Sequence, residues 1–444
     1  MELLEEEFPS ARLVVYKVCE QGCYDIDVLS AFDHAIADGV DIISLSMGYP
    51  DGSLELTSDP FAIGSFHAIE KGILTVNAAG NTGPDFSSIQ NYAPWILTVA
   101  ASDIDRKFVD KLLLKNDATL VGHGINAFPS SDEALPLVYG KEVTNNCTEK
   151  LRQGTVFPHA WRGAWSTIKL FFVMMNPTRM KLIYLEPLVD PRIQILKSEI
   201  VDNPDAPFVA SFSSRGPSTY MYDIIKPDVT APGVEILAAY SPIASPSGLP
   251  SDKNSVKFNI LSGTSMACPH VTAAAAFIKS FHPDWSPSAI KSALMTTGLV
   301  YETSFQEYLK TWCNLTNANC TAKLSPKEIN YPSMAVRVEV GVAVSESFPR
   351  TLTNVGASST YVVSIEGDTS KLRFKVDPNT LQFTKRNLKM NFVVTVKGSK
   401  MKHSTINSAS LVWSDGVHRV RSPIVVYTME KMRHIFLDLT SYLC

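Results

Sequence analysis

The chain has 444 residues, of which 45% are hydrophobic, and a formal net charge of −4. This length allows about three domains, and the lack of a basic surplus argues against a nucleic-acid partner. The longest strongly apolar run, residues 170–175, is far too short to cross a bilayer, so we expect no membrane span. The acidic first residues do not have the charged-then-apolar layout of a signal peptide.

Strands and helices alternate in the first hundred residues. We expect strands at 12–18, 40–47, 73–77 and 95–100, and helices at 27–37 and 60–71. The strands are nearly continuous apolar runs, which is typical of a parallel sheet covered by helices on both faces. Ligands of such sheets bind at the carboxyl ends of the strands.

The middle of the chain is less regular. Residues 102–200 show no clear alternation and no helical face. From residue 207 to residue 240, clusters of proline and glycine predict sharp turns between short strands. Among the carboxylates of this segment, Asp228 is the one that the surrounding sequence suggests is buried. We interpret it as a structural residue.

A strand-to-helix turn follows. Residues 258–261 predict a strand, and Ser265 opens a predicted helix that runs through Lys279. The first N–H groups of a helix have no partner within it, and the helix dipole favours negative charge nearby. Such a position suits a nucleophile that generates an oxyanion, although a lone Gly-Thr-Ser more often only caps a helix. A second helix is predicted at 286–295, with a serine cap and a proline at its first position.

The pattern changes after residue 329. Alternating runs at 360–365, 391–396 and 408–413 are separated by turn residues. Alternation with a period of two, interrupted by turns, predicts a β-sandwich.

Cysteines and glycosylation sequons favour an extracellular protein. Two close cysteine pairs, Cys19 with Cys23 and Cys313 with Cys320, have a spacing that suits local disulfides. No histidine cluster supplies the further ligands that zinc would need, and we expect no metal or other cofactor. The N-glycosylation sequons begin at Asn146, Asn314 and Asn319.

The run Gly263-Thr-Ser-Met-Ala-Cys-Pro-His270 resembles the nucleophile motif of the subtilisin-like serine proteases, in particular the plant, cucumisin-like branch. Further blocks resemble this family over roughly residues 10–115, 190–300 and 325–427, the last matching its C-terminal fibronectin type III-like domain. The resemblance implies an α/β fold with a subtilisin-like parallel sheet flanked by helices, incomplete at the N-terminus. A fibronectin type III-like β-sandwich should follow it.

The resemblance also implies a domain organisation. The expected parts are 1–115 and 193–323 for the catalytic domain, 116–192 for an insert remnant, 324–427 for the sandwich and 428–444 for an unmatched tail. Residues 135–140 and 193–198 resemble the segments that flank the protease-associated insert of plant subtilases. The sequence between them matches nothing in that insert.

The implied activity is that of a serine endopeptidase acting on peptide or protein substrates. Ser265 would be the nucleophile, and the Asn81 side chain would donate to the oxyanion beside the Ser265 N–H. From the residues alone, Asn81-Thr-Gly also fits a simple turn. Edges that pair with an extended peptide would be formed by Ser46, Met47 and Gly48 on one side and by Ala78, Ala79 and Gly80 on the other. Small residues at 78–80 predict a roomy pocket for the side chain before the cut.

The triad acid and base have no counterpart in the sequence. In subtilases both blocks precede the segment with which this sequence begins, and His34, His67, His123 and His270 do not fit the place or order of the base. A nucleophile and oxyanion donors without these partners leave about 10³–10⁴-fold catalysis over water. The sequence therefore predicts a subtilase that is inactive in this form. The alternative is a non-catalytic peptide-binding protein.

Overall fold

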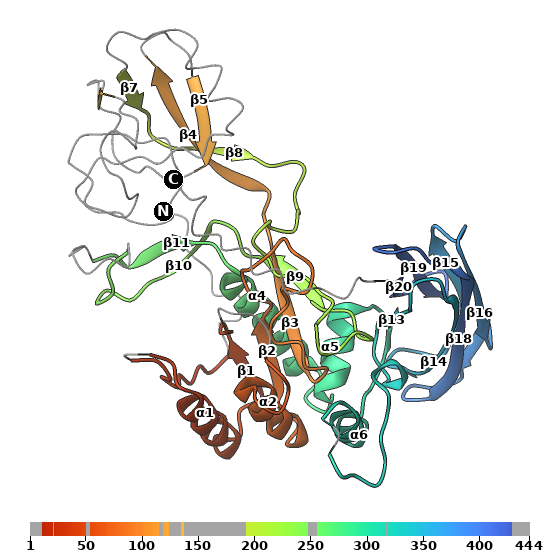
Figure 1. The fold of residues 1–444 in the computed structure, drawn as a ribbon. Coiled ribbons are helices and arrows are strands. Elements are labelled where there is room, and N and C mark those ends of the chain that lie inside the picture. The colour runs from red at the N-terminus through yellow and green to blue at the C-terminus, as the bar shows by residue number, and fades with distance from the viewer. Residues whose placement is uncertain are drawn as a thin grey trace. The chain divides into compact units, whose positions relative to one another are not determined.

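The computed structural model describes residues 11–20, 22–49, 54–114, 119–123, 135–136, 192–246, 255–316 and 318–428. Within these residues the chain divides into two compact units (Figure 1). The first contains the residues up to Ser102, those at 209–234 and those from Ser262 onward. The second contains the residues between 103 and 208 and those between 235 and 261. Most of the predicted insert remnant and the predicted tail lie outside the described residues.

A parallel sheet in the order β1-β2-β3-β9 forms the centre of the first unit. Its strands are β1 Ile42–Leu45, β2 Leu74–Ala78, β3 Ile96–Ser102 and β9 Val229–Pro232. Every residue of β2 and β3 is buried, as expected for continuous apolar runs. The predicted parallel sheet is confirmed.

Helices cover both faces of this sheet (Figure 1). They are α1 Asp25–Asp38, α2 Pro60–Glu70, α4 Thr264–Phe281 and α5 Pro287–Met295. Val76 and Ala78 of β2 pack against α4, whereas Ile43 and Leu45 of β1 pack with α1 and α2. Since successive strand side chains point to opposite faces, these contacts place α4 on one face and the α1–α2 pair on the other.

The predicted strand at residues 12–18 is wrong. The segment has no strand assignment, and Leu13, Val14 and Val15 are 88%, 55% and 78% exposed. A strand is stabilised by a ladder of hydrogen bonds with a neighbour and by packing of its side chains. Among the described residues no strand pairs with this segment. Its β-branched composition therefore cannot produce a strand by itself.

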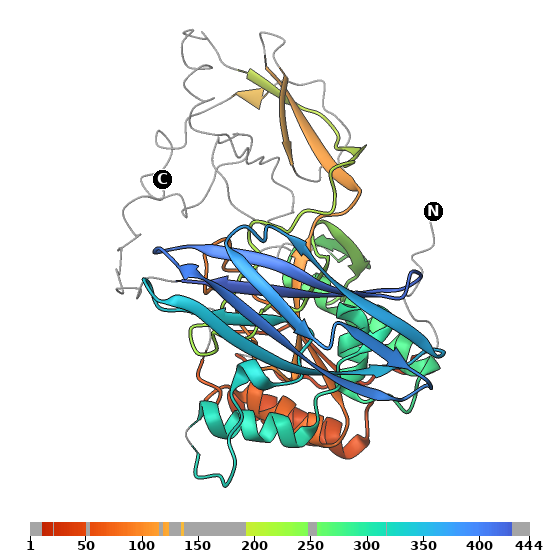
Figure 2. The ribbon, with the colours of Figure 1, turned by 90° about the vertical axis from the view of Figure 1, so that its right-hand side faces the viewer.

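The C-terminal part of the first unit is a sandwich of two sheets (Figure 2). One sheet has the order β12-β14-β18-β16, with β12 Leu299–Val300, β14 Ala343–Asn354, β18 Lys389–Lys400 and β16 Leu372–Asp377. The other has the order β13-β20-β19-β15-β17, with β13 Met334–Arg337, β20 Arg419–Tyr427, β19 Ile406–Ser414, β15 Ser359–Gly367 and β17 Thr380–Phe383. Phe348, Phe392 and Trp413 are buried in the core between the sheets. The predicted β-sandwich is confirmed.

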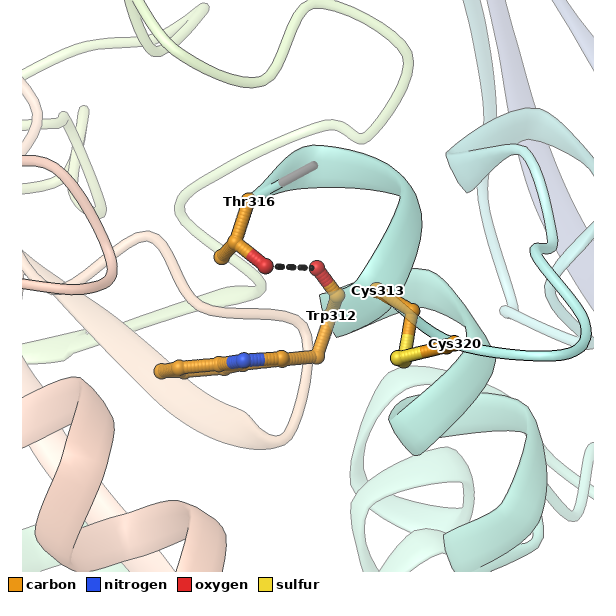
Figure 3. Close-up of a disulfide and its surroundings, with 4 residues drawn as sticks. All are labelled: Trp312, Cys313, Thr316 and Cys320. Atoms are coloured by element: carbon orange, nitrogen blue, oxygen red, sulfur yellow. Dashed lines mark hydrogen bonds between the residues drawn. A yellow bond between two sulfur atoms is a disulfide. The ribbon is translucent and has the colours of Figure 1, made fainter. Parts of the chain in front are cut away.

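A disulfide closes the loop that leaves helix α6, Phe305–Leu315 (Figure 3). It joins Cys313 to Cys320, and a second disulfide joins Cys19 to Cys23. The hydroxyl of Thr316, which belongs to the Asn314 sequon, donates to Trp312 O at 2.8 Å, whereas Asn319 is exposed. A 3-10 turn, Pro326–Glu328, leads into the sandwich. Asn146 and Cys147 lie outside the described residues.

The second unit is built from antiparallel strands. They are β4 Arg106–Leu114, β5 Thr119–His123, β6 Leu135–Pro136, β7 Arg192–Ile195 and β8 Glu199–Asp202, with the separate pair β10 Ile236–Ala239 and β11 Phe258–Leu261. β4 is the central strand, because it pairs with β5, β7 and β8. In the described part of the chain, no helix has the length and apolarity needed to cross a membrane.

Candidate active site

The turn before α4 is built from glycines that allow close backbone approach. Gly263 is the N-cap of α4, and its N–H donates to Gly233 O at 2.8 Å. A Cβ on Gly233 would lie 2.6 Å from the Ala101 side chain and 2.8 Å from Gly263 O. A larger residue at 233 would therefore push the turn away from β3. The predicted helix beginning at Ser265 is confirmed, with its first helical residue at Thr264.

Ser265 lies in the first turn of α4 and contacts the end of β1. Its hydroxyl donates to Ser46 O at 3.1 Å, and the Ser46 hydroxyl donates back to Ser265 O at 2.8 Å. Ser265 is half-buried and Ser46 is exposed, so this pair is accessible from solvent. The reciprocal bonds bring the predicted nucleophile against the first predicted substrate edge.

Thr264 orients the side chain of Asn81. The Thr264 N–H and hydroxyl both donate to Asn81 Oδ1 at 2.9 Å, and the same hydroxyl accepts the Gly80 N–H at 3.2 Å. Because Thr264 holds Asn81 Oδ1, the Asn81 Nδ2 group points away from Thr264 and is able to donate to another acceptor. This Nδ2 lies 3.6 Å from the position that a Cβ on Gly263 would take, next to the helix start. The structure thus brings Asn81 and Ser265 to the same turn.

The two predicted substrate edges extend from adjacent strands. The β1–β2 ladder ends at the pair Leu45 and Asn77. Beyond it, Asn91 Nδ2 donates to Met47 O and to Ala78 O, both at 2.8 Å. One side-chain amide therefore holds together the bases of the edges, residues 46–48 and 78–80, where the ladder has ended.

The space between these edges is not empty. The side chain of Gln90 lies there, 6% exposed, and its Nε2 donates to Tyr49 O at 2.5 Å. The small residues at 78–80 predicted a roomy pocket, but the carboxamide of Gln90 lies against Gly48 and Gly80.

His34, His67 and His270 each have contacts on or next to their own helix. His270 Nδ1 is 2.7 Å from Met266 O on its own helix, and His34 Nδ1 is 2.7 Å from Ser30 O. His67 packs edge-on against Phe66. The side chain of His123 lies outside the described residues.

Asp228 belongs to a buried charge cluster that contacts the backbone at the start of β3. Its Oδ2 is 2.7 Å from Lys226 Nζ and 3.6 Å from Lys291 Nζ, and the Tyr331 hydroxyl donates to its Oδ1. Burial alone would raise the pKa of the Asp228 carboxyl, but the two lysines hold it below its usual value. The carboxylate is fully enclosed, which fits a structural role.

Cys268, one turn from Ser265, is a buried free cysteine. Burial raises the pKa of its thiol, so it is a poor nucleophile at neutral pH. The described residues contain no group of three or more His, Cys, Asp or Glu that could hold a metal ion.

Sequence reasoning missed Thr264, Gln90 and Asn91. Thr264 is adjacent to the predicted nucleophile, Ser265, so its position was a usable signal. Gln90 and Asn91 lie in an irregular segment after a turn, and nothing in their local pattern indicates that they reach the predicted substrate edges.

Comparison with known proteins identifies the family of the chain. The family model described as subtilase family matches residues 5–324, and a fibronectin type-III domain model matches residues 328–426. Subtilisin-like protease SBT4.3 of Arabidopsis thaliana is 40% identical over 503 positions, which cover 95% of this chain and 69% of the relative. Subtilisin-like protease SBT4.10 of the same plant is 44% identical over 473 positions, which cover 95% of this chain and 66% of the relative.

A superposition on the solved structure titled Sphericase covers 62% of this chain and 55% of the Sphericase chain, with 20% sequence identity and a TM-score of 0.32. The family assignment does not depend on this weak superposition. It depends on the two family models and on the plant relatives, which match the chain over nearly its whole length. The chain therefore belongs to the subtilase family, as a plant subtilisin-like serine protease with a C-terminal fibronectin type-III domain.

Proposed function

We propose that the site binds an extended peptide between its two edges and presents the peptide carbonyl to Ser265, as in a serine endopeptidase. The orientation of Asn81 is the observation that supports this most directly. Its Oδ1 is held by two donors of Thr264, so its amide N–H₂ is directed away from that residue. A preoriented donor beside a nucleophile is what a tetrahedral oxyanion requires.

The helix start supplies the second part of the oxyanion site. The Ser265 N–H belongs to the first turn of α4, where N–H groups have no acceptor within the helix. Together with Asn81 Nδ2 it would donate to the carbonyl oxygen as negative charge develops there. The positive end of the helix dipole adds to this stabilisation.

Activation of the nucleophile is the weak part of the site. In the described chain, Ser265 Oγ donates to a backbone carbonyl rather than to an imidazole. Without a base to accept its proton, a serine hydroxyl is a poor nucleophile. We propose that this chain alone hydrolyses peptides no faster than about 10³–10⁴ times the rate in water.

The same observation favours a second candidate function. A non-catalytic peptide-binding protein would keep both edges and the Asn91 bridge between them, and would not need an activated serine. In that case the Ser265–Ser46 bonds are only structural, because they fix the start of α4 to the end of β1.

Labelling with a fluorophosphonate separates the two functions. Attack by Ser265 Oγ forms a bond to phosphorus, releases fluoride and gives up the serine proton to solvent. We expect slow labelling at Ser265, none in Ser265→Ala, and a rate lower by about 10²–10³-fold in Asn81→Leu. Labelling is read by intact mass and by peptide mapping.

Binding of a fluorescent tetrapeptide is measured on the same three proteins. Peptide binding without any labelling supports the binding-only function. Equal labelling of the native chain and Ser265→Ala, or no peptide binding by the native chain, overturns the endopeptidase proposal.

We further propose an extracellular location, supported by two disulfides and by the exposed Asn319 sequon.

A further inference from the structure

We propose that Gln90 determines which substrate side chain the site accepts. This inference rests on the proposed peptide recognition by residues 46–48 and 78–80. Gln90 is in neither edge and was not predicted from the sequence, yet its side chain occupies the gap between them. A residue that contacts both edges would line the space that a substrate side chain enters.

Two glycines show where the Gln90 side chain lies. A Cβ built on Gly48 would lie 2.0 Å from Gln90 Oε1, and a Cβ built on Gly80 would lie 2.7 Å from Gln90 Cδ. Gly48 belongs to one edge and Gly80 to the other, so the carboxamide touches both. Gly80 also has a φ of 100°, a conformation that favours glycine. The absence of side chains at both positions makes room for Gln90.

Hydrogen bonds keep Gln90 in this place. Its backbone N–H donates to Ala79 O at 2.9 Å, and its Nε2 donates to Tyr49 O at 2.5 Å. The next residue, Asn91, bridges Met47 O and Ala78 O. To withdraw, the carboxamide would have to leave Tyr49 O unpaired at a site where Gln90 is only 6% exposed. Gln90 is therefore a fixed wall of the pocket.

The chemistry of this wall indicates the preferred side chain. Gln90 Nε2 donates a hydrogen bond to Tyr49 O, whereas no described residue donates to Gln90 Oε1. The pocket therefore offers a hydrogen-bond acceptor at a short distance from the edges. A short side chain with a donor, such as that of asparagine, fits and pairs with it. An aromatic ring would collide with the carboxamide and would leave Oε1 without a partner.

The test uses the whole chain and its Gln90→Ala and Gln90→Met variants. Affinities for fluorescein-labelled Ala-Ala-Pro-Asn and Ala-Ala-Pro-Phe are measured by fluorescence anisotropy. We expect the native chain to bind the asparagine peptide at least about 10-fold more tightly than the phenylalanine peptide. Gln90→Ala removes the carboxamide from between the two edges, so the preference for the asparagine peptide should disappear or reverse. Gln90→Met keeps the bulk and should still exclude phenylalanine, but should lose the advantage for asparagine.

The outcomes separate the two proposals. If native and Gln90→Ala proteins bind peptides with the same ratio, Gln90 does not set specificity, although peptide recognition stands. If no protein binds either peptide, the proposed function fails and this inference fails with it. Thermal unfolding of each variant is recorded alongside. Should Gln90→Ala not fold, Gln90→Met decides the question, since an unchanged advantage for asparagine in that variant overturns the inference.

Discussion

Replacement of Asp228 by asparagine should be among the most damaging isosteric changes in this protein. The Asp228 side chain is 0% exposed, and that of Lys226 is 1% exposed. Asparagine keeps the shape of the residue but removes the charge that balances the lysine ammonium. Lys226 Nζ also donates to Ile96 O at 2.7 Å and to Thr98 Oγ1 at 3.0 Å, so it is fixed in this interior.

The magnitude follows from the burial. Loss of one partner of a buried ion pair costs about 3–5 kcal/mol, because the remaining charge is left without compensation. The free energy of unfolding of a whole domain is only about 5–15 kcal/mol. Burial lowers the pKa of both Lys226 and Lys291, and the Asp228 carboxylate opposes that shift in each of them. We expect Asp228→Asn to lose about 3–5 kcal/mol at pH 7.

Urea unfolding followed by tryptophan fluorescence measures this loss. Asp377→Asn is the matched control, because Asp377 pairs with Lys375 at an exposed site and the same change there should cost no more than about 1 kcal/mol. Adding Lys226→Met to Asp228→Asn should recover part of the stability. The reasoning is refuted if Asp228→Asn and Asp377→Asn have equal effects, or if the double variant is weaker than Asp228→Asn.

Three further changes are predicted. Burial raises the pKa of the Asp59 carboxyl to about 6; the folded state therefore binds the proton more tightly than the unfolded state, and the free energy of unfolding should fall by about 2 kcal/mol from pH 4 to pH 6. Urea unfolding across this range should show no such fall in Asp59→Asn. Arg350 donates to the carbonyls of Lys327, Tyr331 and Ser333. Its replacement by methionine leaves these carbonyls without a donor and should lower the free energy of unfolding, measured in urea, by about 3 kcal/mol. Replacing both Cys313 and Cys320 by serine should lower the free energy of unfolding, measured by thermal unfolding, by about 2 kcal/mol. The loss is modest because this disulfide closes only a short loop in the unfolded chain.

Each of these has its own check. A parallel pH dependence in native protein and Asp59→Asn would show that the Asp59 carboxyl is not the group that titrates. An Arg350→Lys variant that is as stable as the native chain would show that a single ammonium replaces the guanidinium fork. Reduction of a Cys19→Ser, Cys23→Ser variant, which keeps the Cys313–Cys320 disulfide, should reproduce the effect of the two serines at 313 and 320, and a larger effect of those serines would point to lost packing instead.

Much of the fold was predictable because its signals are local. Helix α1 ends at Gly39, whose φ is 69°, and α5 begins at the serine cap and proline that predicted it. Apolar runs correctly predicted β2 and β3. The run at 12–18 is also rich in valine and leucine, but a strand also needs a neighbour, and composition contains no information about that.

The site shows the same division. The sequence identified Ser265 from a strand–turn–helix pattern and its family motif, and Asn81 from a second motif. It did not indicate that Thr264 holds Asn81 by two hydrogen bonds to one oxygen. Nor did it indicate that the Gln90 side chain lies against Gly48 and Gly80.

By itself, the sequence determined the family, the parallel sheet with its helices, the β-sandwich and the position of the predicted nucleophile, Ser265. These depend on periodicity, caps and motifs within a few residues of each other. Only the tertiary structure decided what lies between the substrate edges and what balances Asp228. Both depend on side chains distant in sequence, such as Gln90 beside Gly48 and Lys291 beside Asp228. The shape and charge of a pocket arise from packing in three dimensions, which no local pattern encodes.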